Sequence, residues 1–214
     1  MSDDTDSMPD TVNDDRTVLP WWHSKLNLAV LGVVLALVAG SLGFVVGNNR
    51  TIPDPNPADI GFLQDMHWHH DQAVELSLTY LSRPGTSPEL RTLAREILVG
   101  QSQEIGMMVQ LLRSWGRVEI NDTDVAMGWM GDPVALDHMP GLASDADIAT
   151  LASSSGTDAD RIFVTLMVAH HEGGIHMAEA AASQASIGQV ATMARQMAAS
   201  QREEINEMRS PVGG

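Results

Sequence analysis

The residues best suited to chemistry in this sequence are two pairs of neighbouring histidines. Each pair is followed, on the next predicted helix, by a Gln-x-x-Glu motif. Imidazole and carboxylate groups can bind a metal ion or bind each other. Adjacent residues on a helix point about 100° apart, so we expect one histidine of each pair, His70 and His171, to face inward and the other to lie at the flank. The full set is His69, His70, His170, His171, Gln101, Glu104, Gln201 and Glu204.

One interpretation of this set is a pair of structural clasps. A buried imidazole needs hydrogen-bond partners, and a glutamate on a neighbouring helix is a common one. Glu104 beside His70, and Glu204 beside His171, would then fix the register of the helices. The alternative is that these side chains bind metal. Di-iron bundles use a Glu-x-x-His motif, and the order here is different, so a di-iron oxidase is not expected.

A second set of donors lies between the two halves of the chain, where methionines accompany a histidine. Thioether and imidazole donors without thiolate suit Cu(I) or Ag(I). Packing of these methionines onto the helices is the competing interpretation. If the segment handles Cu(I), its donors should approach the histidine-bearing helices and form a soft site near the surface. These donors are Met127, Met130, His138 and Met139.

Two further histidines can pair with carboxylates one helical turn away. His67 lies four residues before Asp71, and His176 lies between Glu172 and Glu179. Pairs at this spacing are ordinary surface interactions, and they can also bind Cu(II) or Zn(II) loosely. His67 therefore joins the four paired histidines among the candidate metal ligands.

The composition excludes several classes of function. The chain has 214 residues with 13 Met, 8 His, no Cys and a formal charge of −16. The absence of cysteine excludes disulfides, thiolate metal sites and iron–sulfur clusters. The negative charge opposes binding to phosphate backbones, so nucleic acid is not an expected partner. The sequence has no nucleophile elbow, phosphate loop or HExxH motif, so we expect a protein that is not an enzyme.

An internal repeat predicts how these donors are positioned. Residues 66–77 (MHWHHDQAVELS) align with 167–178 (MVAHHEGGIHMA), and residues 94–108 align with 194–208 at nearly the same offset. This pattern indicates a duplicated helical hairpin. The expected fold is all-α, a four-helix bundle with a long crossover.

Capping signals place the ends of the predicted helices. Asn56 before Pro57 and Ser87 before Pro88 mark two helix starts. Thr157, with Asp160 three residues later, predicts a capping box for the third long helix. The segment after Ser144 predicts a short helix in the linker. The predicted domain, 58–210, comprises repeat one at 58–116, the linker at 117–156 and repeat two at 157–210.

Residues 26–47 are apolar enough to predict a transmembrane helix. At 1.5 Å per residue this segment covers about 30 Å, the thickness of the hydrocarbon core. An acidic tail at 1–25 precedes it, and a short linker at 48–57 follows. The tail is expected to be disordered. An uncleaved anchor is the preferred interpretation, with a cleaved signal peptide as the alternative.

Charges beside this segment predict its orientation. Arg16 and Lys25 precede it, and only Arg50 follows it closely. Because positive charge favours the cytoplasmic side, we expect a single-pass protein of the bacterial cell membrane. Its N-terminus would be cytoplasmic and its C-terminal domain extracytoplasmic.

Over roughly residues 59–208 the sequence resembles the ferritin-like family known as domain of unknown function 305. The resemblance rests on the repeated pattern Met-x-x-His-His-x-x-(Ala/Gly), on Ala-x-x-(Ile/Met)-x-x-x-Gln-x-x-Glu-Ile, and on HMPGLAS at 138–144. It implies a ferritin-like four-helix fold and, from some bacterial members, copper or silver binding outside the cytoplasm, but no reaction. Two positions depart from the pattern: His67 adds a third histidine, and Leu142 replaces a methionine of many relatives.

Two functions follow as expectations. The first is a membrane-anchored protein that binds, buffers or delivers copper, with copper as the cofactor and metal ions as partners. The second is a non-catalytic accessory module of an envelope or respiratory membrane complex, with a protein of that complex as its partner. In the second case the His–Glu pairs are purely structural.

Overall fold

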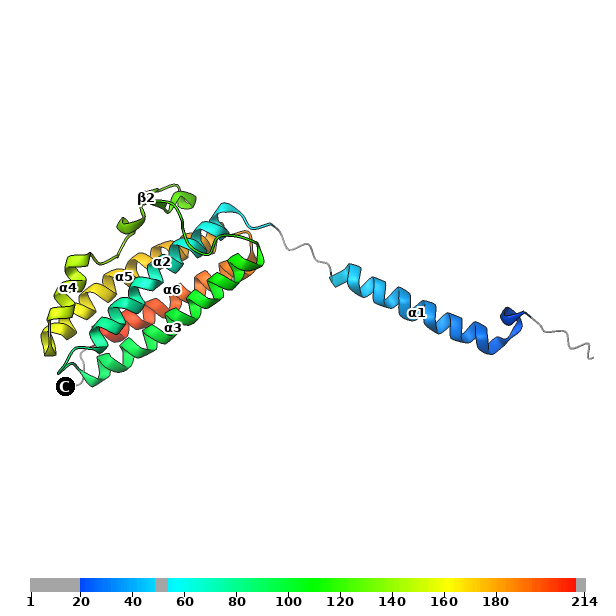
Figure 1. Cartoon of the computed structure of the whole chain (residues 1–214), viewed down its shortest axis with the longest axis horizontal. Helices are drawn as coiled ribbons and strands as arrows, with labels where there is room; N and C mark the ends of the chain where they lie inside the picture. The colour runs from blue at the N-terminus through cyan, green and yellow to red at the C-terminus, as the bar shows by residue number, and fades with distance from the viewer. Residues whose placement is uncertain (1–19, 49–53, 211–214) are drawn as a thin grey trace, which may run out of the picture. The chain divides into compact units, whose positions relative to one another are not determined.

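The computed structural model describes residues 20–48 and 54–210, and the chain divides into two compact units, Met1–Thr51 and Ile52–Gly214. The first unit contains a 3-10 helix, Trp21–His23, and the helix α1, Lys25–Asn48 (Figure 1). α1 is long and apolar enough to cross a membrane. A segment of this kind serves as an anchor or as a signal sequence. Most of the predicted tail and linker, at 1–19 and 49–53, lies outside the described residues.

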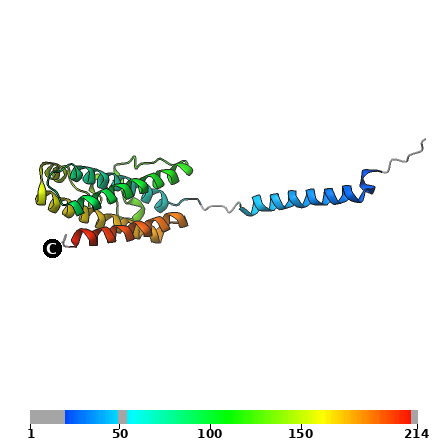
Figure 2. The same cartoon turned by 90° about the horizontal axis from the view of Figure 1, so that it is seen from below.

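The second unit is built from four long helices. α2 packs against α3, α5 packs against α6, and α2 also packs against α5. Figure 2 shows two layers, with α2 and α3 above α6. The helices are α2, Pro57–Leu81; α3, Pro88–Ser114; α5, Gly156–Gln184; and α6, Gly188–Arg209.

The connection between α3 and α5 runs along α2 and α5, on the side away from α3 (Figure 1). Its two short strands pair antiparallel, with Val125 opposite Ala135. This ribbon was not predicted from the sequence. In chain order the elements are β1, Val125–Ala126; η2, Gly128–Met130; β2, Val134–Ala135; η3, Leu136–His138; and α4, Asp145–Ser153.

Most helix starts follow the predicted caps. Asn56 and Asp59 form a reciprocal capping box at α2, Ser87 caps α3, and Ser144 caps α4. The predicted Thr157 cap is wrong, because the N-cap of α5 is Ser155, two residues earlier, and Ser155 makes no side-chain cap hydrogen bond.

Asp160, the other half of the capping box expected at Thr157, has a tertiary role. Its carboxylate accepts hydrogen bonds from the Tyr80 hydroxyl at 2.6 Å and from the Ser87 backbone N–H at 3.1 Å. It therefore joins α5 to the turn between α2 and α3. Contacts from another hairpin outweigh the local capping pattern at this position.

The core contains two apolar clusters. One lies around the stacked rings of Tyr80 and Phe163, whose centroids are 4.2 Å apart. The other, here called the methionine cluster, buries seven of the chain's 13 methionines. These are Met66, Met108, Met127, Met139, Met177, Met193 and Met197.

Candidate functional site

A layer of polar side chains separates the two apolar clusters. On each of the four long helices, residues of one cluster precede this layer along the chain and residues of the other cluster follow it. The imidazoles come from α2 and α5, and the glutamines and glutamates come from α3 and α6. The polar layer consists of His69, His70, Gln101, Glu104, His170, His171, Gln201 and Glu204.

Both predicted clasps are present in the layer. His70 Nε2 lies 2.7 Å from Glu104 Oε2, and His171 Nε2 lies 2.6 Å from Glu204 Oε2. Because a carboxylate only accepts, the imidazole N–H donates in each pair. The imidazoles are fully buried, whereas the glutamate side chains are 19% and 21% exposed. Each clasp therefore reaches from the core to the solvent edge of the next helix.

The expected flank positions of His69 and His170 are wrong, because both side chains are fully buried. α2 is covered by α3 on one side and by α5 on another, so two neighbouring positions on it can both face protein. The His69 and His170 rings lie face to face, with centroids 3.8 Å apart and planes 32° from parallel. His170 Nε2 lies 2.8 Å from the His69 carbonyl, and His69 Nε2 lies 3.3 Å from the Pro140 carbonyl.

Burial keeps this stacked pair neutral. Burial, followed by the charge of the neighbouring His70, lowers the pKa of His69 to about 3. Burial and the adjacent histidines also lower the pKa of His170 well below its ordinary value. A ring nitrogen binds metal through a lone pair in the ring plane. Two stacked rings direct these lone pairs past each other, so His69 and His170 do not form a chelating pair.

Several polar atoms of the layer have no hydrogen-bond partner. They are the Nδ1 atoms of all four histidines and both amide atoms of Gln101 and Gln201. Within residues 20–48 and 54–210, no three His, Asp or Glu side chains are placed to hold one metal ion. The histidines of the layer therefore do not form a ready-made metal centre.

The connection between the hairpins brings its three methionines to one place. Met127 and Met139 are buried within the methionine cluster, and Met130 is partly buried against it. This is the packing that the competing interpretation predicts. His138 is separate from them, because its side chain is 77% exposed and its Nδ1 lies 2.7 Å from Asp137. His138 also lines a cavity of about 640 Å³ beside Trp68.

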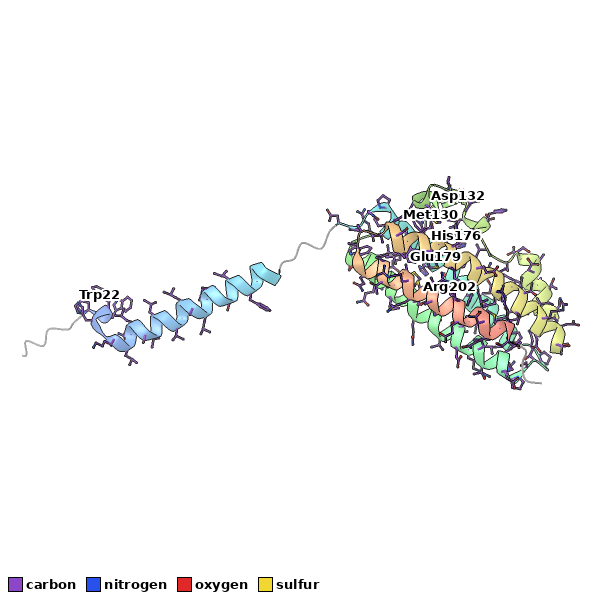
Figure 3. All side chains as sticks on the ribbon, turned by 180° about the vertical axis from the view of Figure 1, so that it is seen from behind. Trp22, Met130, Asp132, His176, Glu179 and Arg202 are labelled. Carbon is purple, nitrogen blue, oxygen red and sulfur yellow. The ribbon has the colours of Figure 1, made fainter. Side chains whose placement is uncertain are left out.

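The two remaining candidate histidines differ in exposure. His67 is nearly buried, with Nδ1 2.9 Å from the Glu119 carbonyl and Nε2 3.6 Å from Asp71. His176 is exposed on α5. Figure 3 shows it toward the same end of the second unit as Met130.

The carboxylates expected beside His176 have other partners. Glu179 forms an ion pair with Arg202 of α6, and Glu172 forms one with Arg209. These salt bridges join α5 to α6. In the described structure, the two carboxylates predicted to pair with His176 therefore pair with arginines instead.

Asp65 is an important residue that was not predicted from the sequence. Its buried carboxylate accepts hydrogen bonds from Asn121 Nδ2 at 2.7 Å, Met127 N at 2.8 Å and Trp129 Nε1 at 2.9 Å. Burial raises its pKa, although these hydrogen bonds oppose the shift. Met127 has φ = 60°, a conformation that side chains disfavour. Asp65 therefore holds the connection onto α2 at a strained residue.

A signal for Asp65 was present in the sequence. It lies three residues after Phe62 and four before His69, on the face of α2 that is otherwise apolar or histidine. A carboxylate on the buried face of a helix requires partners. Donors in a nearby long loop are the natural source.

These features define a mostly helical protein whose core holds imidazole, carboxylate and thioether groups but no thiolate. The chain belongs to the DUF305 family, described as a domain of unknown function, which matches residues 59–211. The resemblance predicted from the sequence is thereby confirmed. No curated protein matches the chain.

Solved structures support this assignment. A DUF305 protein from Streptomyces coelicolor, described as a candidate secreted protein, is 38% identical, with a TM-score of 0.65 over 71% of this chain and 89% of that one. A DUF305 fragment from Deinococcus radiodurans is 30% identical, with a TM-score of 0.62 over 73% of this chain and 95% of that one. CopM in its Cu(I)-bound form is 27% identical, with a TM-score of 0.51 over 71% and 92%. CopM is also solved with Cu(II) and with silver.

Proposed function

We propose that this protein is a membrane-anchored, extracytoplasmic copper-binding protein that buffers or delivers Cu(I) and also accepts Ag(I), without enzymatic activity. The observation that carries the proposal is the likeness to CopM, which is solved with Cu(I) and silver bound and is matched over 92% of its length. The donor chemistry of this chain supports it, since thioethers and imidazoles favour these ions.

We place the copper site at the rim of the methionine cluster. Met130 packs against this cluster and is partly accessible. His176 is exposed, while its neighbours Ile175 and Met177 pack against or within the same cluster. Figure 3 shows Met130 and His176 toward the same end of the second unit. A thioether and an imidazole at the edge of a methionine-rich core offer Cu(I) soft ligands that it can reach from solvent.

We also propose that the four long helices form a ferritin-like bundle that arose by duplication. The two clasps support this, because His70–Glu104 joins α2 to α3 as His171–Glu204 joins α5 to α6. The matched pairs stand about one hundred residues apart in the sequence. Symmetry of this kind places equivalent side chains on opposite halves of one core.

Anchoring is the remaining part of the proposal. α1 has the length and apolarity of a membrane span, and basic residues flank the side that we assign to the cytoplasm. The Streptomyces relative is described as a candidate secreted protein, which is consistent with an extracytoplasmic domain.

A structural accessory role is the second candidate function. The closed His–Glu clasps favour it, because both imidazoles are fully buried and already bonded to a carboxylate. In that role the protein would join an envelope or respiratory complex and would bind no copper. Metal binding by the purified chain separates the two functions.

The test is titration of the full chain, in a neutral detergent, with Cu(I), Ag(I), Cu(II) and Zn(II). Met130→Leu nearly conserves volume, so the fold should tolerate it. We expect Met130→Leu and His176→Gln each to weaken Cu(I) and Ag(I) binding at least tenfold. The matched controls are Met107→Leu and His138→Gln, at an exposed thioether and an exposed imidazole elsewhere, and both should bind like the parent. A parent chain that binds neither ion would favour the accessory role.

A further inference from the structure

The outer face of α3 is uncharged over about four helical turns. Every exposed residue of α3 between positions 97 and 112 is uncharged, although the whole chain has a formal charge of −16. Two of these residues are apolar, since Val99 is 51% exposed and Met107 is 46% exposed. We call this set the α3 face: Val99, Ser102, Gln103, Gly106, Met107 and Gln110. The connection that contains Met130 packs on α2 and α5 instead, so the α3 face is separate from the proposed copper site (Figure 1).

The second hairpin shows that the fold does not require an uncharged face here. Residues 94–108 of α3 align in sequence with residues 194–208 of α6. The equivalent pairs on the two helices are Ser102 and Arg202, Gln103 and Glu203, and Met107 and Glu207. All three α6 residues are charged and exposed. Because the same positions carry charge in one hairpin, the absence of charge in the other needs a separate explanation.

Two glycines of α3 have no steric role within the domain. A Cβ atom added at Gly100 or Gly106 would meet nothing within 4 Å, whereas one at Gly61 of α2 would collide with Trp129. Glycine inside a helix costs stability relative to alanine. The packing of the domain does not explain this cost at Gly100 and Gly106. Glycine does allow another backbone to approach a helix closely from outside.

We propose that the α3 face is the contact surface between two copies of this protein related by a two-fold axis. Such a dimer needs a face that is complementary to itself. A face of one charge would repel its copy, and the α3 face has no charge. Hydroxyl and amide groups both donate and accept hydrogen bonds, so Ser102, Gln103 and Gln110 can each bond to the same side chain of the other copy. Val99 and Met107 supply the apolar contact.

α1 favours a second copy over an unrelated protein as the occupant of this face. Small residues recur every four positions along α1, at Gly32, Ala36 and Gly40. This spacing is typical of membrane helices that pair closely. A membrane span of this kind holds two copies in one bilayer and raises the effective concentration of their outer domains. This support rests on the proposed anchoring, whereas the features of the α3 face do not.

The absence of cysteine from the chain makes a position-specific test possible. A single introduced thiol can be crosslinked only to the same thiol of another copy. The test is Gln103→Cys in the full chain in neutral detergent, treated with a short bis-maleimide, and we expect most of the protein to form crosslinked dimer at micromolar concentration. The matched control is Glu203→Cys, at the equivalent exposed position of α6, which should crosslink at least tenfold less.

Two outcomes of this experiment would overturn the proposal. Equal yields from Gln103→Cys and Glu203→Cys would mean that the copies meet by random collision or through another surface. A chain that stays monomeric and gives no dimer with Gln103→Cys would exclude a second copy from the α3 face, and an uncharged surface of another envelope protein would become the better occupant.

A charge placed on the α3 face should separate the two copies. Met107→Glu gives this position the residue type that α6 carries at Glu207, so the fold should tolerate it. Added to Gln103→Cys, it should lower the crosslinked fraction at least tenfold because like charges would face each other. The matched control is Gln196→Glu, which adds the same charge at an exposed position of α6 and should leave the crosslinked fraction unchanged. Undiminished crosslinking with Met107→Glu would overturn the proposal.

Gly106→Gln tests the close approach of the two copies without adding a charge. Its side chain would enter open space within the domain, and glutamine is a better helix former than glycine. The variant should therefore keep its fold, which circular dichroism checks. Added to Gln103→Cys, it should lower the crosslinked fraction at least tenfold, and crosslinking at the level of Gln103→Cys alone would overturn the proposal.

Silver titration of the same variants separates this proposal from the proposed function. Met107→Glu should bind Ag(I) like the parent, because Met130 and His176 are unchanged. A parent chain that binds Ag(I) and gives no dimer with Gln103→Cys would overturn the dimer alone. A chain that crosslinks at Gln103→Cys and binds neither Cu(I) nor Ag(I) would support the dimer and overturn the copper function.

Discussion

The stacked pair of His69 and His170 should make the fold sensitive to acid well above the range in which most carboxylates titrate. An unfolded histidine has a pKa near 6.5, and burial lowers the pKa of His69 to about 3. Between these values the unfolded chain binds more protons than the folded chain. The contribution of the buried, neutral His69 to the free energy of unfolding is therefore complete above pH 6.5 and is lost as the pH falls below that value.

The size of the effect follows from the two pKa values of His69. At pH 5 the unfolded imidazole is almost fully protonated while the folded one is neutral. The free energy of unfolding is therefore about 2 kcal/mol lower at pH 5 than at pH 7. His170 contributes with the same sign, because burial also lowers its pKa. His70 and His171 are the titratable groups that act on this pair. Asp65 acts in the opposite direction, since its raised pKa favours the folded state in acid.

Urea unfolding of the full chain in neutral detergent, followed by circular dichroism at pH 7, 6 and 5, measures the effect. His69→Phe/His170→Phe keeps two stacked rings and removes both titrating groups, so its stability should depend much less on pH. His138→Gln, at an exposed imidazole, is the matched control and should follow the parent. If the double variant loses as much stability as the parent between pH 7 and pH 5, the reasoning about the stacked pair is wrong.

Three further predictions concern the clasps, the connection and the topology. Glu104→Ala should strand a buried imidazole N–H and lower unfolding free energy by about 1–3 kcal/mol, whereas Glu203→Ala, at an exposed position, should not; an unchanged melt would refute the clasp. Asp65→Ala should release the connection from α2 and speed proteolytic cleavage within residues 117–135, detected by mass spectrometry, and cleavage at the parent's rate would contradict this role. Protease added to intact cells should digest the C-terminal domain and spare residues 1–25; a protected C-terminal domain would exclude the proposed orientation.

Local signals predicted the helices well because capping chemistry is local. Asn56, Ser87 and Ser144 each offer a side-chain oxygen to a nearby backbone N–H, and the structure uses all three. The cap predicted at Thr157 does not form. Its expected partner, Asp160, instead accepts a hydrogen bond from the hydroxyl of Tyr80, which is distant in sequence. A motif of four residues cannot reveal such a tertiary competitor.

The site was predicted less completely, for reasons of packing. Spacing along one helix identified the face that carries His70, but it could not show that α5 covers the neighbouring face as well. His69 was therefore expected at the flank and is instead buried against His170. Likewise, composition could identify the methionines of the connection as soft donors, but not that Met127 and Met139 would be buried in the core.

The position of the polar layer between two apolar clusters explains how it can specify register. If α3 slid by one residue along α2, a neighbour of Glu104, either Gln103 or Ile105, would take its place opposite His70. Ile105 would leave the imidazole N–H buried without an acceptor, a cost that slippage within a purely apolar core would not incur. The same reasoning applies to Glu204 and His171 in the second hairpin. The clasps thus penalise misregistered packing of each hairpin.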